Sequence, residues 1–290
     1  MRLSIIASLV AISATSTLAY VDRIVLFADS MSDNGNVYKH SGFPPSPPYW
    51  EGRFSDGPTW AEHVADSISI PFENIGYAGA TTDNADAYSE YNGYVVPGLK
   101  QQIETIKSKG TSKSLYIIQT GYNDLNVINT PQFYNVVNQN YTTADIAANV
   151  VASTKAIIKK YKAKKFVFMS PPPFEQWPFI ADADKPRVAK LIEGYNALVK
   201  SELKKNIHGV DLKFIDVHGW LNKQLAHPEK LGVSTINGPC IWGLGNTTAP
   251  LCDEPKDHFF FDSFHPNSVV HKALAESTLK DLKRWYKIHQ

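Results

Sequence analysis

Short apolar runs alternate with segments of helical spacing along most of this chain. Five runs have the length and the content of branched and aromatic residues expected of buried strands. They cover residues 24–27, 72–75, 115–118, 166–169 and 214–217. Apolar residues at helical spacing predict five helices between and after these strands. The first begins near residue 56, and the others cover residues 98–109, 142–161, 184–204 and 266–286.

This alternation limits the fold more than any other feature of the sequence. It is typical of α/β proteins, in which helices cover both faces of a sheet. We therefore predict a single domain, a three-layer α/β/α sandwich around a mainly parallel, doubly wound sheet. Right-handed crossovers bring the carboxyl ends of parallel strands to one edge of such a sheet. Three residues that can take part in catalysis follow predicted strands: Ser30, Gly79 and Asn123.

Composition and motif content exclude several classes of partner. The 290 residues are 43% hydrophobic, which is enough for a full core. The formal net charge is +1, so charge gives no reason to expect nucleic acid or an anionic membrane surface as a partner. The sequence has no phosphate-binding loop, no dinucleotide-binding glycine motif and no zinc-ligand spacing. We expect no cofactor, no metal and a monomeric protein.

The amino terminus has the features of a signal peptide. Arg2 precedes a mostly apolar run over residues 3–12, and small residues, Thr17 and Ala19, stand at positions suited to cleavage after Ala19. A membrane anchor is the alternative, but the run is too short and too rich in Ser and Thr for stable insertion into a membrane. We therefore expect residues 1–19 to be removed and residues 20–290 to form a secreted hydrolase domain.

Secretion bears on the cysteines and on two sequons. Cys240 and Cys252 are the only cysteines, and an oxidising compartment favours a disulfide between them. Two free buried thiols are the alternative. The sequons at Asn140 and Asn246 are candidate glycosylation sites on surface loops.

Two separated stretches together suggest a serine hydrolase. Ser30 follows the first predicted strand, and near the carboxyl terminus Asp262 stands three residues before His265. A tight turn there would let Asp262 orient the imidazole that activates Ser30. Taken alone, Ser30 is more often a turn residue and Asp262 a helix cap. The sequence has no G-x-S-x-G motif, which disfavours the common nucleophile-elbow hydrolases.

A loop rich in proline and aromatic residues follows the first strand. It carries Tyr49, Trp50 and Phe54, and its prolines exclude a helix or an inner strand. A long loop beside a strand end commonly lines a site, so these three rings are candidate substrate-binding residues. The alternative is that the rings only bury themselves.

Four short motifs, in order, resemble the GDSL, or SGNH, family of serine esterases and lipases. Residues 27–36 resemble the first block of that family, and residues 74–81 resemble the second. Residues 121–124 match its G-x-N-D motif, and residues 262–265 match its D-x-x-H motif. In the first block, alanine replaces the usual glycine at position 28 and methionine replaces leucine at position 31. The added methyl of residue 28 is expected to crowd a turn that glycine normally fills.

The resemblance implies an SGNH-type fold and a role for each matching residue. Ser30 would be the nucleophile, His265 the general base and Asp262 the residue that orients it. The oxyanion hole would consist of the backbone N–H groups of Ser30 and Gly79 and the side-chain amide of Asn123.

The resemblance also suggests a range of functions. Residues 49–60 are similar to the secreted microbial branch of the family, which includes fungal acetylesterases of carbohydrate esterase family 16, lipases and haemolysin-like phospholipases. The favoured hypothesis is a secreted esterase for short-chain or acetyl esters, carbohydrate esters among them. A lipase or phospholipase and an acyltransferase are alternatives on the same residues. An inactive carbohydrate- or lipid-binding protein is an alternative from a different class.

Overall fold

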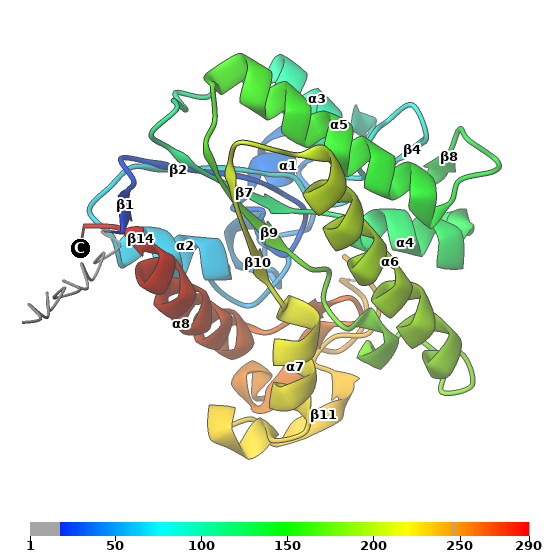
Figure 1. Cartoon of the computed structure of the whole chain (residues 1–290). Helices are drawn as coiled ribbons and strands as arrows, with labels where there is room; N and C mark the ends of the chain where they lie inside the picture. The colour runs from blue at the N-terminus through cyan, green and yellow to red at the C-terminus, as the bar shows by residue number, and fades with distance from the viewer. Residues whose placement is uncertain (1–17, 246, 290) are drawn as a thin grey trace, which may run out of the picture.

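A parallel sheet of five strands forms the centre of the computed structural model, which describes residues 18–245 and 247–289 (Figure 1). The strands are β2 (Ile24–Ala28), β3 (Phe72–Gly76), β7 (Leu115–Gln119), β9 (Lys165–Met169) and β10 (Asp211–Ile215). Their order across the sheet is β10-β9-β7-β2-β3. The chain thus builds outward from β2 in one direction through β3 and in the other through β7. Ligands of open α/β sheets bind at this kind of switch point, here between β2 and β7.

Burial on both faces explains why these runs form inner strands. All five residues of β2 are buried. Val25 and Phe27 belong to one hydrophobic cluster, whereas Ile24 and Leu26 belong to another, as the alternation of side chains along a strand requires.

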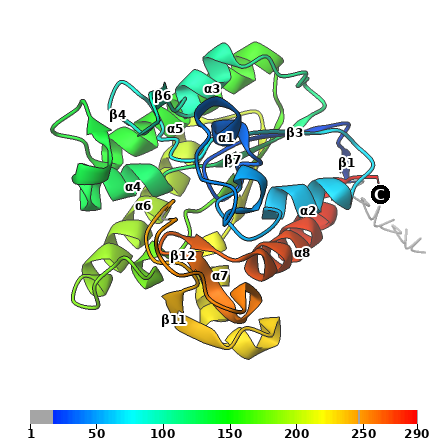
Figure 2. The ribbon, with the colours of Figure 1, turned by 180° about the vertical axis from the view of Figure 1, so that it is seen from behind.

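Helices cover both faces of the sheet, so the predicted α/β/α architecture is confirmed (Figures 1 and 2). One layer contains α3 (Leu99–Thr105), α5 (Thr143–Tyr161) and α6 (Lys185–Asn206). The other contains α2 (Trp60–Asp66), α7 (Val217–Leu225) and α8 (Ser268–Trp285). Thr142 and Asp145 form the capping box that begins α5, as the sequence indicates.

Smaller elements connect these layers. The helical ones are α1 (Asn36–Ser41), α4 (Tyr122–Asn129) and the 3₁₀ turns η1 (Trp50–Gly52), η2 (Pro131–Phe133), η3 (Phe174–Gln176), η4 (Pro228–Leu231) and η5 (Pro255–Asp257). The extended ones are β1 (Ala19–Tyr20), β4 (Ala87–Tyr88), β5 (Glu90–Tyr91), β6 (Tyr94–Val95), β8 (Asn135–Val136), β11 (Thr235–Pro239), β12 (His258–Asp262), β13 (His265–Pro266) and β14 (Tyr286–Lys287).

Several predicted boundaries were wrong, and capping explains two of them. The helix expected over residues 98–109 ends at Thr105, because the backbone at Ile106 is extended. The helix expected from residue 56 begins at Trp60, because Thr59 forms a capping box with Glu62. The strand expected over residues 214–217 ends at Ile215, because the carboxylate of Asp216 accepts the Gly219 N–H and caps α7.

Two expectations fall on residues that the structure does not describe. Most of the expected signal peptide, residues 1–17, and the candidate glycosylation site Asn246 lie outside the described residues. Asn140, at the other sequon, is exposed in the loop before α5. Within residues 18–245 and 247–289, no helix has the length and apolar character needed to cross a bilayer.

Candidate active site

The loop that follows β2 is held rigidly by one buried carboxylate. Asp33 accepts hydrogen bonds from the backbone N–H groups of Gly35 and Asn36 at 2.8 and 2.6 Å, and from that of Ala78 at 2.9 Å. Burial raises the pKa of Asp33 to about 6, while these donors favour its ionised form. The loop bearing Ser30 is therefore fixed to the segment that follows β3.

The residue that replaces the family glycine does not crowd this loop. Ala28 is the last residue of β2, opposite Gly76 on β3, and its methyl packs in the hydrophobic core. The expectation of a crowded turn was wrong, because position 28 belongs to the strand. Met31 is likewise fully buried in the same core cluster.

Ser30, His265 and Asp262 form a hydrogen-bonded chain. The Oγ of Ser30 lies 2.8 Å from Nε2 of His265, although the two residues are 235 positions apart. The Nδ1 of His265 lies 2.9 and 3.0 Å from the two carboxylate oxygens of Asp262. Asp262 is fully buried and the other two are at most 4% exposed. The geometry is that of a nucleophile, a base and an orienting acid.

Further hydrogen bonds fix the orientation of the Asp262 carboxylate. Its Oδ1 accepts the backbone N–H of Phe264 at 2.7 Å, and its Oδ2 accepts the hydroxyl of Tyr49 at 2.8 Å. The hydroxyl of Tyr49 in turn accepts the backbone N–H of Gly245 at 2.9 Å. Burial and the neighbouring carboxylate raise the pKa of Tyr49 far above its ordinary value, so the hydroxyl stays protonated and donates.

A disulfide-closed loop supports the segment that carries Asp262. Cys240 and Cys252 are bonded, with an S–S distance of 2.04 Å, which confirms the predicted pairing. Within this loop the backbone N–H of Gly243 donates to Oγ of Ser263 at 2.9 Å. On the other side of His265, α8 begins with Asn267 as its cap, not Asp262.

The structure places the expected oxyanion residues beside Ser30, around one cavity. Gly79 has a φ of +81°, and a Cβ there would lie 2.7 Å from Oγ of Ser89, so only glycine fits. Asn123 lies in the first turn of α4, after Gly121, whose φ is +103°. The side-chain N–H of Asn123 donates to the Ala80 carbonyl at 2.9 Å, which uses one of its two donors.

The cavity in front of Ser30 has a volume of about 410 Å³. Amide and hydroxyl groups from α4 and its neighbours mix with aromatic rings in its lining. The lining residues are Ser30, Phe54, Gly79, Ser89, Tyr91, Tyr122, Asn123, Asn126, Thr130, Phe133, Tyr134, Gly243, Leu244, Phe264 and His265.

Of the three expected substrate-binding rings, only one lines this cavity. Phe54 lies there, with its ring centroid 5.1 Å from that of His265. Tyr49 is only 1% exposed and its hydroxyl serves Asp262, so the expectation that its ring stacks on substrate was wrong. Trp50 is absent from the cavity lining, and the guanidinium of Arg53 covers its ring at 4.6 Å.

Two features of the site have no local signal in the sequence. The partnership of Tyr49 with Asp262 spans 213 positions, so no motif contains both. Asp29, next to Ser30, is 1% exposed and its Oδ2 has no hydrogen-bond partner. Burial is the main reason that the pKa of Asp29 rises to about 7. Among the described residues, no group of three or more His, Cys, Asp or Glu side chains is arranged to hold a metal ion.

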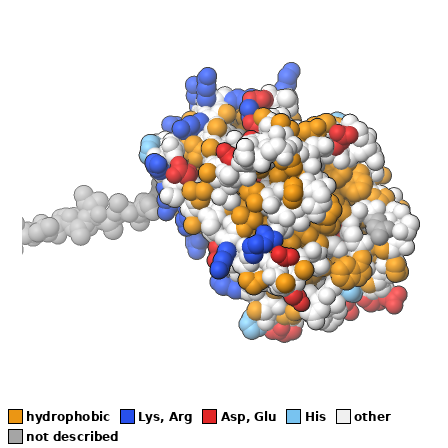
Figure 3. Space-filling view, turned by 90° about the vertical axis from the view of Figure 1, so that its right-hand side faces the viewer, with side chains coloured by type: hydrophobic (Ala, Val, Ile, Leu, Met, Phe, Trp, Pro, Cys, Tyr) orange, Lys and Arg blue, Asp and Glu red, His pale blue; other side chains and the backbone are white. Residues whose placement is uncertain are grey.

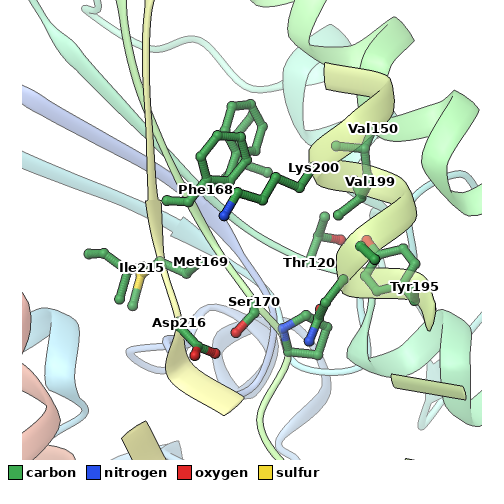
Figure 4. Close-up of a pocket in the computed structure, with 15 residues that line it drawn as sticks. Thr120, Val150, Phe168, Met169, Ser170, Tyr195, Val199, Lys200, Ile215 and Asp216 are labelled. Atoms are coloured by element: carbon green, nitrogen blue, oxygen red, sulfur yellow. The ribbon is translucent and has the colours of Figure 1, made fainter. Parts of the chain in front are cut away.

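A second cavity, of about 440 Å³, lies between α6 and the carboxyl ends of β7, β9 and β10 (Figure 4). Phe168, Met169 and Ile215 line its sheet side, and Lys200 enters it from α6. Neither Ser30 nor His265 belongs to its lining. This cavity is therefore separate from the candidate active site.

The parallel sheet, with Ser30, His265 and Asp262 hydrogen-bonded at its switch point, has the arrangement of a serine hydrolase on an α/β fold. The sequence profile described as GDSL-like Lipase/Acylhydrolase matches residues 24–278. This match covers most of the chain, so the chain belongs to that family and is a carboxylic ester hydrolase.

Known relatives are distant and varied. The chain is 24% identical to the Thermolabile hemolysin of Vibrio parahaemolyticus, over 90% of this chain but only 63% of that protein's length. It is also 24% identical to a Phosphatidylcholine-sterol acyltransferase of Aeromonas hydrophila, over 95% of this chain and 94% of that protein. The structure of an acetyl xylan esterase from Geobacillus stearothermophilus matches with a TM-score of 0.55 at 14% identity, over 94% of this chain and 99% of the other. That likeness shows the shared fold.

Proposed function

We propose that the protein is a secreted serine esterase whose catalytic triad is Ser30, His265 and Asp262. The observation that carries the proposal is the 2.8 Å approach of Ser30 Oγ to His265 Nε2, with Asp262 on the opposite ring nitrogen. His265 takes the proton as Ser30 forms a bond to the ester carbonyl carbon. The same proton passes to the leaving alcohol, and a water molecule activated by His265 then releases the acid.

In this proposal three donors stabilise the oxyanion. They are the backbone N–H groups of Ser30 and Gly79 and the second side-chain N–H of Asn123. All three residues line the same cavity, which supports the assignment. Fixed donors in a buried site stabilise developing charge without reorganisation at the moment of reaction.

The preferred substrates are esters of small acyl groups, carbohydrate acetates among them, as in the fungal acetylesterase branch that residues 49–60 resemble. The aromatic and polar lining of the cavity supports this choice, because sugar esters need both kinds of contact. Residues 1–19 act as a signal peptide, and residues 20–290 are the mature, monomeric domain. The proposal includes glycosylation of Asn140 and Asn246 in the secreted protein.

A lipase or phospholipase is the second candidate, because two large exposed apolar side chains belong to the cavity lining or adjoin it in sequence. Phe133 is 59% exposed and also lines the cavity, and Trp242, next to Gly243 of the lining, is 58% exposed. Figure 3 shows that hydrophobic side chains form broad patches on one face of the molecule. Such patches suit contact with an aggregated lipid. An acyltransferase, the remaining alternative, would use the same residues, with an alcohol in place of water as the acceptor of the acyl group.

Replacement of Ser30 by alanine tests the proposal. We expect the turnover of p-nitrophenyl acetate to fall by several powers of ten, because the covalent nucleophile is lost, while the circular dichroism spectrum stays unchanged. Near-normal turnover by this variant would reject the triad. If the wild-type protein itself hydrolyses no ester, an inactive carbohydrate- or lipid-binding protein is favoured instead. A series of esters from acetyl to palmitoyl then separates the acetylesterase from the lipase.

A further inference from the structure

A hydroxyl from a neighbouring loop holds the side chain of Asn123 in place. Tyr134 follows the 3₁₀ turn η2 and lines the cavity in front of Ser30. Its hydroxyl donates to Oδ1 of Asn123 at 3.1 Å, while Nδ2 of Asn123 donates to the Ala80 carbonyl at 2.9 Å. These two bonds hold the oxygen and the nitrogen of one amide group, so together they fix its plane and the direction of its remaining N–H.

The Tyr134 hydroxyl can donate in one direction only. Burial raises the pKa of Tyr134 far above its ordinary value, although a hydrogen bond from the side-chain amide of Asn126 opposes the rise. The hydroxyl therefore stays protonated, and its oxygen accepts from Asn126 while its single O–H donates to Asn123. Donation to the carbonyl oxygen of an amide also polarises that amide and strengthens its N–H groups as donors.

Strand pairing holds the segment that carries Tyr134. β8 begins at the next residue and pairs with β4. One residue after β4, Oγ of Ser89 donates to the Gly79 carbonyl at 2.8 Å. The residues that flank this pair of strands therefore bond to two of the three proposed oxyanion residues, Tyr134 to Asn123 and Ser89 to Gly79.

We propose that Tyr134 is a positioning residue for the reaction, which holds the amide of Asn123 with its free N–H directed at the oxyanion. This inference rests on the proposed esterase function and adds to it a residue outside the triad and the oxyanion hole. Without the hydroxyl, the bond to Ala80 alone would let the amide turn about χ2. A donor that has to reorganise stabilises the transition state less than one that is already in place.

Tyr134→Phe removes the hydroxyl and keeps the ring. We expect kcat for p-nitrophenyl acetate to fall on the order of tenfold with little change in KM, because the loss affects the transition state and not the bound ester. The decisive measurement is a double-mutant cycle with Asn123→Ala. Once the amide is absent, Tyr134 has nothing to position, so the double variant should have the same kcat as Asn123→Ala alone.

Tyr141→Phe is the matched control. The hydroxyl of Tyr141 donates to Oδ1 of Asp124, the next residue of α4, at 2.6 Å, and Tyr141 does not line the cavity. Both substitutions thus remove a tyrosine hydroxyl that is bonded to a side chain of α4, and both should lower the midpoint of urea unfolding. Only Tyr134→Phe frees the amide of Asn123, so Tyr141→Phe should keep kcat near the wild-type value.

The outcomes separate this inference from the proposed function. A wild-type kcat in Tyr134→Phe, a loss confined to KM, an equal loss of kcat in Tyr141→Phe, or a further loss in the double variant would overturn the role of Tyr134 while leaving the esterase intact. Failure of the wild type to hydrolyse any ester would instead overturn the proposed function. If Tyr134→Phe does not fold, Tyr134→Met, with a flexible apolar side chain that adapts to irregular gaps, removes the same donor and tests the same prediction.

Discussion

Asn123 has two roles, one structural and one proposed for catalysis, and measurements of stability and of kcat on a single variant test both. Its amide holds the Ala80 carbonyl, and its remaining N–H is proposed to stabilise the oxyanion. We expect Asn123→Ala to lower kcat by roughly 10²–10³ with little change in KM, because a donor to the transition state is lost. The lost hydrogen bonds should also lower the free energy of unfolding by about 1–3 kcal/mol. A destabilised enzyme with its kcat preserved would make Asn123 a structural residue only.

Tyr49 gives a second prediction at the scale of one atom. Tyr49→Phe keeps the ring packed against Phe261, whose centroid lies 5.1 Å away, but removes the hydroxyl's hydrogen bonds to Oδ2 of Asp262 and to the Gly245 N–H. We expect the free energy of unfolding to fall by about 1–3 kcal/mol and kcat to fall on the order of tenfold. Steady-state kinetics and urea unfolding check both numbers. An unchanged kcat would show that Asp262 needs no support from Tyr49.

At the scale of elements, the disulfide loop is the part whose removal is easiest to measure. The Cys240–Cys252 bond closes a loop with a sequence separation of 12. The chain-entropy model gives such a loop about 3 kcal/mol of stabilisation. We expect the double variant with serine at both positions to lose about this much in urea unfolding. An unchanged midpoint of urea unfolding would mean that the other contacts of the loop hold it without the disulfide. Mass measurement after alkylation without reductant verifies the bond in the wild type.

The sequence predicts the strands well because burial on both faces leaves an unambiguous apolar run, as in residues 24–28 of β2. It does not predict α4 or α7, since each is short and follows a strand directly. Their starts depend on local backbone geometry, the positive φ of Gly121 for α4 and the side-chain cap of Asp216 for α7. Periodicity over fewer than three turns carries little information.

The candidate site likewise contains residues that the sequence predicts and contacts that it does not. Ser30, Asp262 and His265 are predictable because each stands in a short motif next to a strand end or a turn. The hydrogen bond of Tyr49 to Asp262 is not predictable, because it depends on the path of a loop 213 positions away.

At the scale of the whole molecule, a buried acid makes stability depend on pH. The pKa of Asp29 rises from 3.8 to about 7 in the folded state, chiefly through burial. The folded state therefore binds more protons than the unfolded state between these pH values, and the free energy of unfolding falls as pH rises from about 4 to about 7. The linkage amounts to at most about 4 kcal/mol.

Asp29→Asn tests this dependence, because an amide of the same shape carries no charge to bury. We expect the variant and the wild type to have similar free energies of unfolding near pH 4. The variant should become the more stable of the two by pH 8, by on the order of 1–4 kcal/mol. Urea unfolding at the two pH values provides the comparison. A difference that does not change with pH would mean that Asp29 does not titrate in this range.

The pairing of β1 with β14 places the first and last described strands side by side, with Ala19 opposite Tyr286 and Tyr20 opposite Lys287 (Figure 1). A short linker between these strands would turn the chain into a ring without crossing the molecule. New ends opened in the exposed turn between α3 and β7 would then yield a circular permutant. In that permutant Ser30 and His265, 235 positions apart in the natural order, would be separated by only a few dozen residues. The distance in sequence between Ser30 and His265 thus depends on the position at which the ring is opened, and the site itself does not require it.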